Sequence, residues 1–177
     1  MSAIFAAGRL LCAFEDLAVE LQGDRDDSFS PPYTTLNVGE IRGGTAKNIV
    51  AAECSFQMEW RPIPSQRAEL VYERLQELAS GASVEGLEIR VELLRLETGF
   101  ATPRNSPLLR LLERPDTPMQ TLSFGTEAPW LARMGAEVVV LGPGSMLTAH
   151  SPRECVPAAE LEACVDLLRT AVNHFCR

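Results

Sequence analysis

Lysine is almost absent from this sequence of 177 residues, which carries its positive charge on arginine. Of its 16 basic residues only Lys47 is a lysine, and 24 acidic residues give a formal net charge of −8. Binding to nucleic acid requires a basic surface that neutralises phosphates. We therefore expect no nucleic-acid partner.

Histidines and paired cysteines are scarce as well. The chain has two histidines, His150 and His174, and no C-x-x-C pair among its five cysteines, which are Cys12, Cys54, Cys155, Cys164 and Cys176. An odd, dispersed set of cysteines indicates neither a disulfide framework nor a zinc ribbon. Glycine-rich phosphate loops, a G-x-S-x-G elbow and H-E-x-x-H are missing from the sequence too. Two histidines cannot build a metal site by themselves.

Long apolar runs are also missing. No run approaches the ~18 residues that a transmembrane helix needs. Residues 1–7 lack the basic region and the cleavage site of a secretory signal. We therefore expect no membrane partner and a location in the cytoplasm.

Residues 1–97 show periodic patterns that predict the order α-β-β-α-β. Apolar residues at helical spacing predict a helix over the first twenty or so residues, and Ser65 is expected to cap a second helix to about residue 80. Strict two-residue alternation predicts an antiparallel pair over residues 33–41 and 48–61, and a third strand over residues 87–93. This order is a ferredoxin-like split β-α-β fold that lacks its first strand, which leaves an unpaired place in the sheet.

Residues 103–177 have too few elements for an independent α/β domain. We expect helices at 107–113, capped by Ser106, at 130–134, and from Pro157 onward. The last helix should carry one apolar stripe, formed by Leu161, Cys164, Val165, Leu168, Val172 and Phe175. Residues 119–124 read as a short strand, and residues 136–141 as a buried, parallel-type strand. This part is interpreted as the last βαβ portion of a larger α/β domain. The fold class is therefore mixed, α+β with an α/β part.

The loop after the last strand holds the most suggestive side chain. His150 follows the turn Gly142-Pro143-Gly144, at the carboxyl end of the expected strand, where ligand sites of α/β sheets gather. A carboxylate, Glu154, comes four residues later. Glycines that free backbone N–H groups, an imidazole and a carboxylate are together what an anion-and-metal site needs. A loop with a chance histidine is the alternative. His174, near the end of the last helix, fits a structural role beside the helix dipole.

Three other residues are candidates for a binding site, and each of them has a purely structural interpretation as well. Arg61 offers a planar group for a carboxylate or is a solvated strand-end arginine. Asn48 follows Gly43-Gly44 and is more typical of a turn. Glu127 is equally compatible with a site carboxylate and a helix start.

Four motifs in order carry a resemblance to a known family. They are G-G-T-A-K-N-I-V at 43–50, E-W-R-P-I-P at 59–64, G-T-E-A-P at 125–129, and L-G-P-G-S followed by A-H-S-P-R-E between 141 and 154. Together they resemble the acetylornithine deacetylase branch of the M20 metallopeptidase and amidohydrolase family, across essentially the whole chain.

The resemblance implies a lid and dimerisation domain in residues 1–101 and the final segment of a zinc-peptidase-like catalytic domain in residues 102–177. It implies a homodimer formed through the lid, zinc or cobalt as cofactor, and hydrolysis of a small N-acyl amino acid. The residues that match the family's site form one set. Asn48 and Arg61 would bind the substrate carboxylate or the oxyanion, Glu127 would favour acetylornithine-like substrates, Gly142 and Gly144 would line the pocket, and His150 would bind a metal.

The sequence departs from the family in one large respect. It has neither an H-x-D motif nor a paired Glu-Glu motif for the other metal ligands, and no residue matches the general base. One ligand leaves no closed coordination sphere, since zinc needs at least three protein ligands. We therefore expect no hydrolase activity from this chain alone. A non-catalytic dimerisation or binding module remains the alternative, as do related desuccinylases of succinyl-diaminopimelate, aminoacylases and carboxypeptidases.

Overall fold

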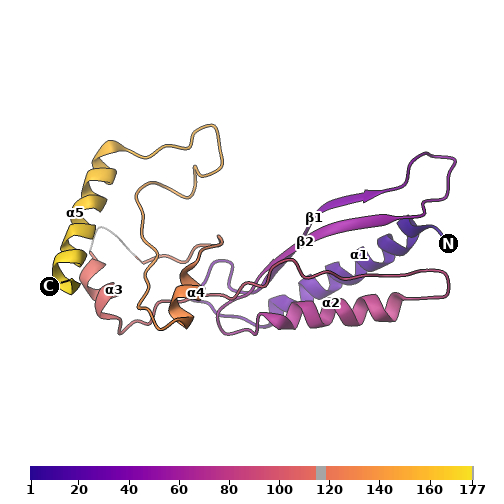
Figure 1. The fold of residues 1–177 in the computed structure, drawn as a ribbon, viewed down its shortest axis with the longest axis horizontal. Helices are drawn as coiled ribbons and strands as arrows, with labels where there is room; N and C mark the ends of the chain where they lie inside the picture. The colour runs from indigo at the N-terminus through magenta and orange to yellow at the C-terminus, as the bar shows by residue number, and fades with distance from the viewer. Residues whose placement is uncertain (115–118, 177) are drawn as a thin grey trace. The chain divides into compact units, whose positions relative to one another are not determined.

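The computed structural model describes residues 1–114 and 119–176, and the chain forms two compact units (Figure 1). Unit 1 comprises residues 1–101 and 121–125, and unit 2 comprises residues 102–120 and 126–177. The chain thus returns to unit 1 for five residues before it continues in unit 2. The division into a lid of residues 1–101 and a catalytic segment of residues 102–177 stays a prediction.

Unit 1 contains two helices and a hairpin. They are α1 (Ala3–Glu20), the short 3-10 turn η1 (Leu21–Gly23), β1 (Thr35–Gly43), β2 (Cys54–Arg61) and α2 (Glu69–Ala82). The expected first helix is confirmed. Its buried side chains Leu10, Phe14 and Leu17 recur at intervals of three and four, so they share one face. The second helix begins at Glu69, one turn later than the expected cap at Ser65.

The hairpin pairs β1 with β2 in antiparallel register and gives the sheet one apolar and one polar face. Leu36 lies opposite Trp60, and Val38 lies opposite Met58. The register shifts at Gly39, between Val38 and Glu40, which is the signature of a β-bulge. The predicted two-residue alternation is therefore confirmed. The second strand is shorter than predicted, however, because residues 48–53 lie in the loop before Cys54.

The core of unit 1 lies between the apolar face of the hairpin and the two helices, which run side by side in Figure 1. Phe14 of α1 meets Phe56 of β2 edge to face, with ring centroids 5.5 Å apart. Val71 and Leu75 of α2 complete the buried cluster. Burying one such side chain contributes roughly 1.5–3 kcal/mol, so this two-layer packing is the main stabilising feature of the unit.

The prediction of a third hydrogen-bonded strand is wrong. Residues 87–93 form no strand, although Leu87, Ile89 and Val91 stay half-buried and the residues between them are exposed. Ile89 packs against the core cluster. In a split β-α-β fold the last strand pairs with the first strand. The fold predicted for residues 1–97 already lacked that first strand. Alternation predicted the two faces correctly, but no ladder forms without a neighbour.

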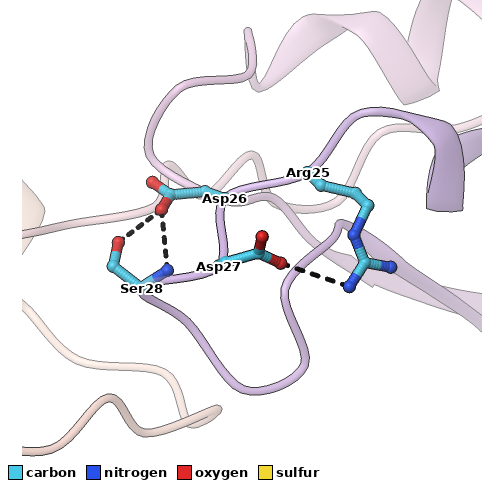
Figure 2. A network of polar contacts seen from close by, with 4 residues as sticks. All are labelled: Arg25, Asp26, Asp27 and Ser28. Atoms are coloured by element: carbon cyan, nitrogen blue, oxygen red, sulfur yellow. Dashed lines mark hydrogen bonds and ion pairs between the residues drawn. The ribbon is translucent and has the colours of Figure 1, made fainter.

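A tight turn follows α1 in the acidic loop (Figure 2). The Asp26 carboxylate accepts hydrogen bonds from the N–H and the hydroxyl of Ser28, and Arg25 pairs with Asp27 at 3.2 Å. The hydroxyl and then the N–H of Ser28 lower the pKa of Asp26. These side chains order the loop as an Asx turn.

Unit 2 contains α3 (Pro107–Leu112), α4 (Ala128–Arg133) and α5 (Ala158–Phe175). The expected cap of α3 is confirmed, because the Ser106 hydroxyl accepts from the Leu109 N–H at 3.0 Å. Leu109 and Leu112 of α3 and Leu167 of α5 are buried. Most of the apolar stripe expected on α5 is exposed, including Leu161, Val165, Leu168, Val172 and Phe175.

The two strands expected in this part of the chain are wrong. Residues 119–124 and 136–141 form no strand, and Val138 and Val139 are only half-buried. A parallel strand exists through hydrogen bonds to neighbours on its edges. Among the described residues the hairpin is the single sheet, so an apolar run such as 138–141 has nothing to pair with.

Candidate functional site

The polar face of the hairpin carries the first group of candidate residues. Cross-strand pairing places Thr35 opposite Arg61 and Asn37 opposite Glu59, so these four side chains share one face. With Pro31 and Ser123 they line an open hollow of about 290 Å³. It combines a guanidinium, a carboxylate, an amide and a hydroxyl, which is a polar lining suited to a small charged ligand.

Arg61 lies at the end of β2 and is already engaged. Its Nε donates to Glu59 Oε1 at 2.5 Å, and its Nη1 donates to the main-chain carbonyl of Ser123. The side chain is 46% exposed and that of Glu59 is 62% exposed. An ion pair this exposed contributes little to the stability of the fold.

Asn48 lies far from Arg61 along the hairpin. It occupies an exposed turn in the loop that joins β1 to β2, while Arg61 ends β2. The length of β2 alone separates the two ends by roughly 23 Å at about 3.3 Å per residue. One copy of the chain therefore does not bring Asn48 and Arg61 to a single ligand.

The remaining candidates belong to unit 2. Glu127 is exposed at the start of α4, where its carbonyl accepts the N–H groups of Trp130 and Leu131. Gly144 has φ +94° and donates its N–H to Glu160 Oε2 at 2.9 Å. A positive φ of this size favours glycine, so the turn depends on Gly144 more than on Gly142.

His150 is held in a strained, left-handed conformation with φ +58°. Its backbone N–H donates to Glu154 Oε2 at 2.7 Å. Ser151 reinforces the turn through its hydroxyl, which donates to the Thr148 carbonyl at 2.6 Å. The sequence suggested Glu154 as part of an anion-and-metal site. In the structure its carboxylate stabilises the main chain that carries His150.

The described residues do not fit a complete metal site. No group of three or more His, Cys, Asp or Glu side chains comes together in residues 1–114 and 119–176. A zinc site uses at least three protein ligands. Among these described residues, His150 therefore belongs to no cluster of three candidate metal ligands.

Of the six residues around the hollow, the sequence identified only Arg61 as a candidate. Glu59 was named only as part of the motif at 59–64, although a Glu and an Arg two positions apart on a strand share one face. Ser123 contacts Arg61 through its carbonyl, 62 residues along the chain, and no local pattern signals that contact. No helix in the described part of the chain has the length and apolarity to cross a membrane.

Comparisons with known proteins place this geometry in a family context. Residues 1–86 match the family model of the M20 peptidase dimerisation domain. A protein named acetylornithine deacetylase from Myxococcus xanthus is 42% identical over an alignment that covers 99% of this chain and 47% of that protein. Proteins of the same name from Edwardsiella ictaluri and Erwinia tasmaniensis are 33% and 32% identical, over 85% and 86% of this chain. The chain spans less than half the length of each of these relatives.

Proposed function

The chain belongs to the M20 family as an acetylornithine deacetylase-like protein, and we propose that it supplies the dimerisation module and part of the substrate site of such an amidohydrolase. One observation carries this proposal. The similarity to the Myxococcus xanthus relative covers 99% of the chain, well beyond the 86 residues of the dimerisation model. The similarity to this one relative therefore extends over both units.

The site residues divide into roles that their chemistry supports. Arg61 would bind the substrate carboxylate, because a planar guanidinium offers two parallel donors to it. Asn48 would contact the ligand that is bound to Arg61 of a second copy, because Arg61 of the same copy lies at the other end of β2. Glu127 would select the side chain of the N-acyl amino acid. The Gly142–Gly144 turn would line the pocket with bare main chain.

Zinc or cobalt is the cofactor that the proposal requires, with His150 as one ligand. At least two further ligands would have to come from another chain or from a further part of the protein. The proposal therefore also holds that this chain hydrolyses no N-acyl amino acid by itself.

The finer architecture belongs to the proposal as well. Unit 1 would be a ferredoxin-like lid whose sheet is incomplete, and unit 2 would be the end of a zinc-peptidase-like α/β domain. A homodimer through the lid, a place in arginine biosynthesis and a cytoplasmic location follow from the same family likeness.

A chimeric enzyme tests the proposal. Residues 1–177 would replace the matching segment of the Myxococcus xanthus relative, and hydrolysis of N-acetylornithine and bound metal would be measured. We expect hydrolysis, and loss of activity and of part of the metal in His150→Ala. His174→Ala is the matched control because the second histidine lies on α5, in its last turn.

The outcomes of this experiment separate the alternatives. Turnover of succinyl-diaminopimelate in place of N-acetylornithine would assign the chain to another M20 branch. A folded chimera that turns over neither would contradict an enzymatic role. A non-catalytic dimerisation module would then stand, which the match of residues 1–86 to a dimerisation domain favours on its own.

A further inference from the structure

Arg61 joins β2 to the five residues of the chain that return to unit 1. Its Nη1 donates to the carbonyl of Ser123 in the middle of this segment, and the Ser30 N–H donates to the hydroxyl of Thr121 at the start of the segment, at 3.1 Å. Within the described part of unit 1, these two hydrogen bonds connect residues 121–125 to the rest of the unit. Arg61 therefore provides one of the two anchors of this segment.

Each edge of the guanidinium has one nitrogen already engaged. A carboxylate binds a guanidinium through two parallel donors, either Nε with Nη2 or Nη1 with Nη2. Glu59 accepts from Nε and the Ser123 carbonyl accepts from Nη1. A bidentate carboxylate on the Nη1–Nη2 edge therefore competes with the Ser123 carbonyl, and one on the Nε–Nη2 edge competes with Glu59.

We propose that Arg61 is a carboxylate-dependent switch: a ligand carboxylate takes the Nη1–Nη2 edge and releases the Ser123 carbonyl, which frees residues 122–125 while Thr121 stays bound to Ser30. The identity of the ligand as an N-acyl amino acid rests on the proposed function. The anchoring of residues 121–125 by Arg61 does not.

The charges of the two partners decide which one leaves. Glu59 is an anion and its hydrogen bond to Arg61 joins two charged groups, whereas the Ser123 carbonyl is neutral. Hydrogen bonds between two charged groups are the stronger kind. The incoming carboxylate therefore replaces Ser123, and Glu59 keeps its place on Nε.

Release of the segment acts on the chain that leads to a candidate pocket residue. Gly125 ends the segment and Thr126 and Glu127 follow directly. A substrate carboxylate on Arg61 would thus loosen the chain before Glu127. Because coupling between two equilibria is reciprocal, weakening the segment's anchors must raise the affinity for carboxylates.

The hairpin offers a matched control for Arg61. Arg42 of β1 also pairs with a glutamate two residues earlier on its own strand, Glu40. Its side chain is exposed, like that of Arg61. Within the described residues the hydrogen bonds of Arg42 stay inside the hairpin, so Arg42→Gln removes a similar ion pair without touching residues 121–125.

Backbone ¹⁵N relaxation of residues 122–125 in the full chain measures the release. Without ligand we expect order parameters near the rigid value of about 0.85 in the wild type and in Arg42→Gln. In Arg61→Gln and Arg61→Lys they should fall below about 0.6, because neither side chain can hold Glu59 and Ser123 together. Unchanged order parameters in both Arg61 variants would overturn the anchoring.

Two probes of the same size test the ligand step. N-acetylglycine carries the carboxylate, and N-acetylglycinamide carries a neutral amide instead. N-acetylglycine should lower the order parameters of residues 122–125 in the wild type and in Arg42→Gln but not further in the Arg61 variants, and N-acetylglycinamide should change nothing. Thr121→Val, which removes the second anchor, should raise the affinity for N-acetylglycine about 2- to 10-fold.

The experiments distinguish a failure of the Arg61 switch from a failure of the proposed function. If N-acetylglycine does not bind Arg61, or binds it while residues 122–125 stay rigid, the switch is wrong. An inactive chimera combined with mobile residues 122–125 in Arg61→Gln would reject the proposed function and leave the anchor intact.

Discussion

Gly99 lies directly against the main chain of Pro62. A β-carbon placed on Gly99 would lie 2.6 Å from the Pro62 carbonyl oxygen and 2.6 Å from the Pro64 nitrogen. Backbone atoms on both sides leave no flexible side chain that could move away. This close approach fixes residues 98–100 on the segment that follows β2.

Gly99→Ala is therefore expected to destabilise unit 1 by about 1–3 kcal/mol, because an extra methyl group in a packed site forces main-chain shifts. Gly8→Ala is the control, since nothing lies within 4 Å of a β-carbon at Gly8 inside α1. That change should stabilise the protein by roughly 0.5–1 kcal/mol. Urea denaturation measures both, and a neutral Gly99→Ala would contradict the packing.

Thr34 is fully buried, and its hydroxyl connects the start of β1 to the chain after β2. It accepts the Ile63 N–H at 3.2 Å and donates to Gln66 Oε1 at 2.5 Å. Thr34→Val keeps the shape but leaves the Ile63 N–H unpaired, which costs about 1–3 kcal/mol. Thr34→Ser retains the hydroxyl and should lose less. A loss in Thr34→Ser as large as that in Thr34→Val, measured by thermal unfolding, would show that the hydroxyl contributes no more to stability than the methyl group.

The sequence predicts those parts of the fold whose signal is local. The alternation from Ala52 to Arg61 sets the two faces of β2, and the spacing of Leu10, Phe14 and Leu17 sets the buried face of α1. Both are confirmed because each pattern needs only its own segment. Residues 87–93 and 136–141 carry equally clear patterns but need neighbouring strands, which the described residues do not provide.

The candidate site shows the same limit. Arg61 was identified from a motif, but its partner Ser123 lies 62 residues away and contributes a carbonyl that every residue type has. The role of Glu154 was reversed for a related reason. Spacing shows that its carboxylate comes close to His150, and only the structure shows that the backbone N–H is what it binds.

The start of α1 and the loop of the hairpin expose apolar side chains that suit a dimer contact. Phe5 is 73% exposed, and Ile4, Ile49 and Val50 are exposed as well. Ala3 N–H donates to the Ala51 carbonyl at 2.9 Å, which joins the helix start to that loop. If this patch pairs two copies, Phe5→Asp should shift the chain toward monomer in light scattering at micromolar concentration. Leu147→Asp, in unit 2, is the control, and a dimer that survives Phe5→Asp would place the contact elsewhere.

The side chain of Glu137 forms hydrogen bonds to the residues at the start of α3. Its Oε1 accepts from the Ser106 hydroxyl and from the Leu108 N–H at 3.0 Å. The Ser106 hydroxyl first and the Leu108 N–H second lower the pKa of Glu137 below its usual value.

A lowered pKa in the folded state makes stability depend on pH with a definite sign. The contribution of Glu137 is complete above the pKa of an unfolded glutamate, about 4.3, and is lost as the pH falls through the lower folded value. Glu137→Gln should therefore lose stability relative to wild type at pH 7, and the difference should shrink on acidification below about pH 4. Thermal unfolding from pH 7 to pH 3 measures this, with Glu162→Gln on the exposed side of α5 as the control. A difference that stays constant across that range would show that the cap does not depend on the charge of Glu137, and that Ser106 alone holds the start of α3.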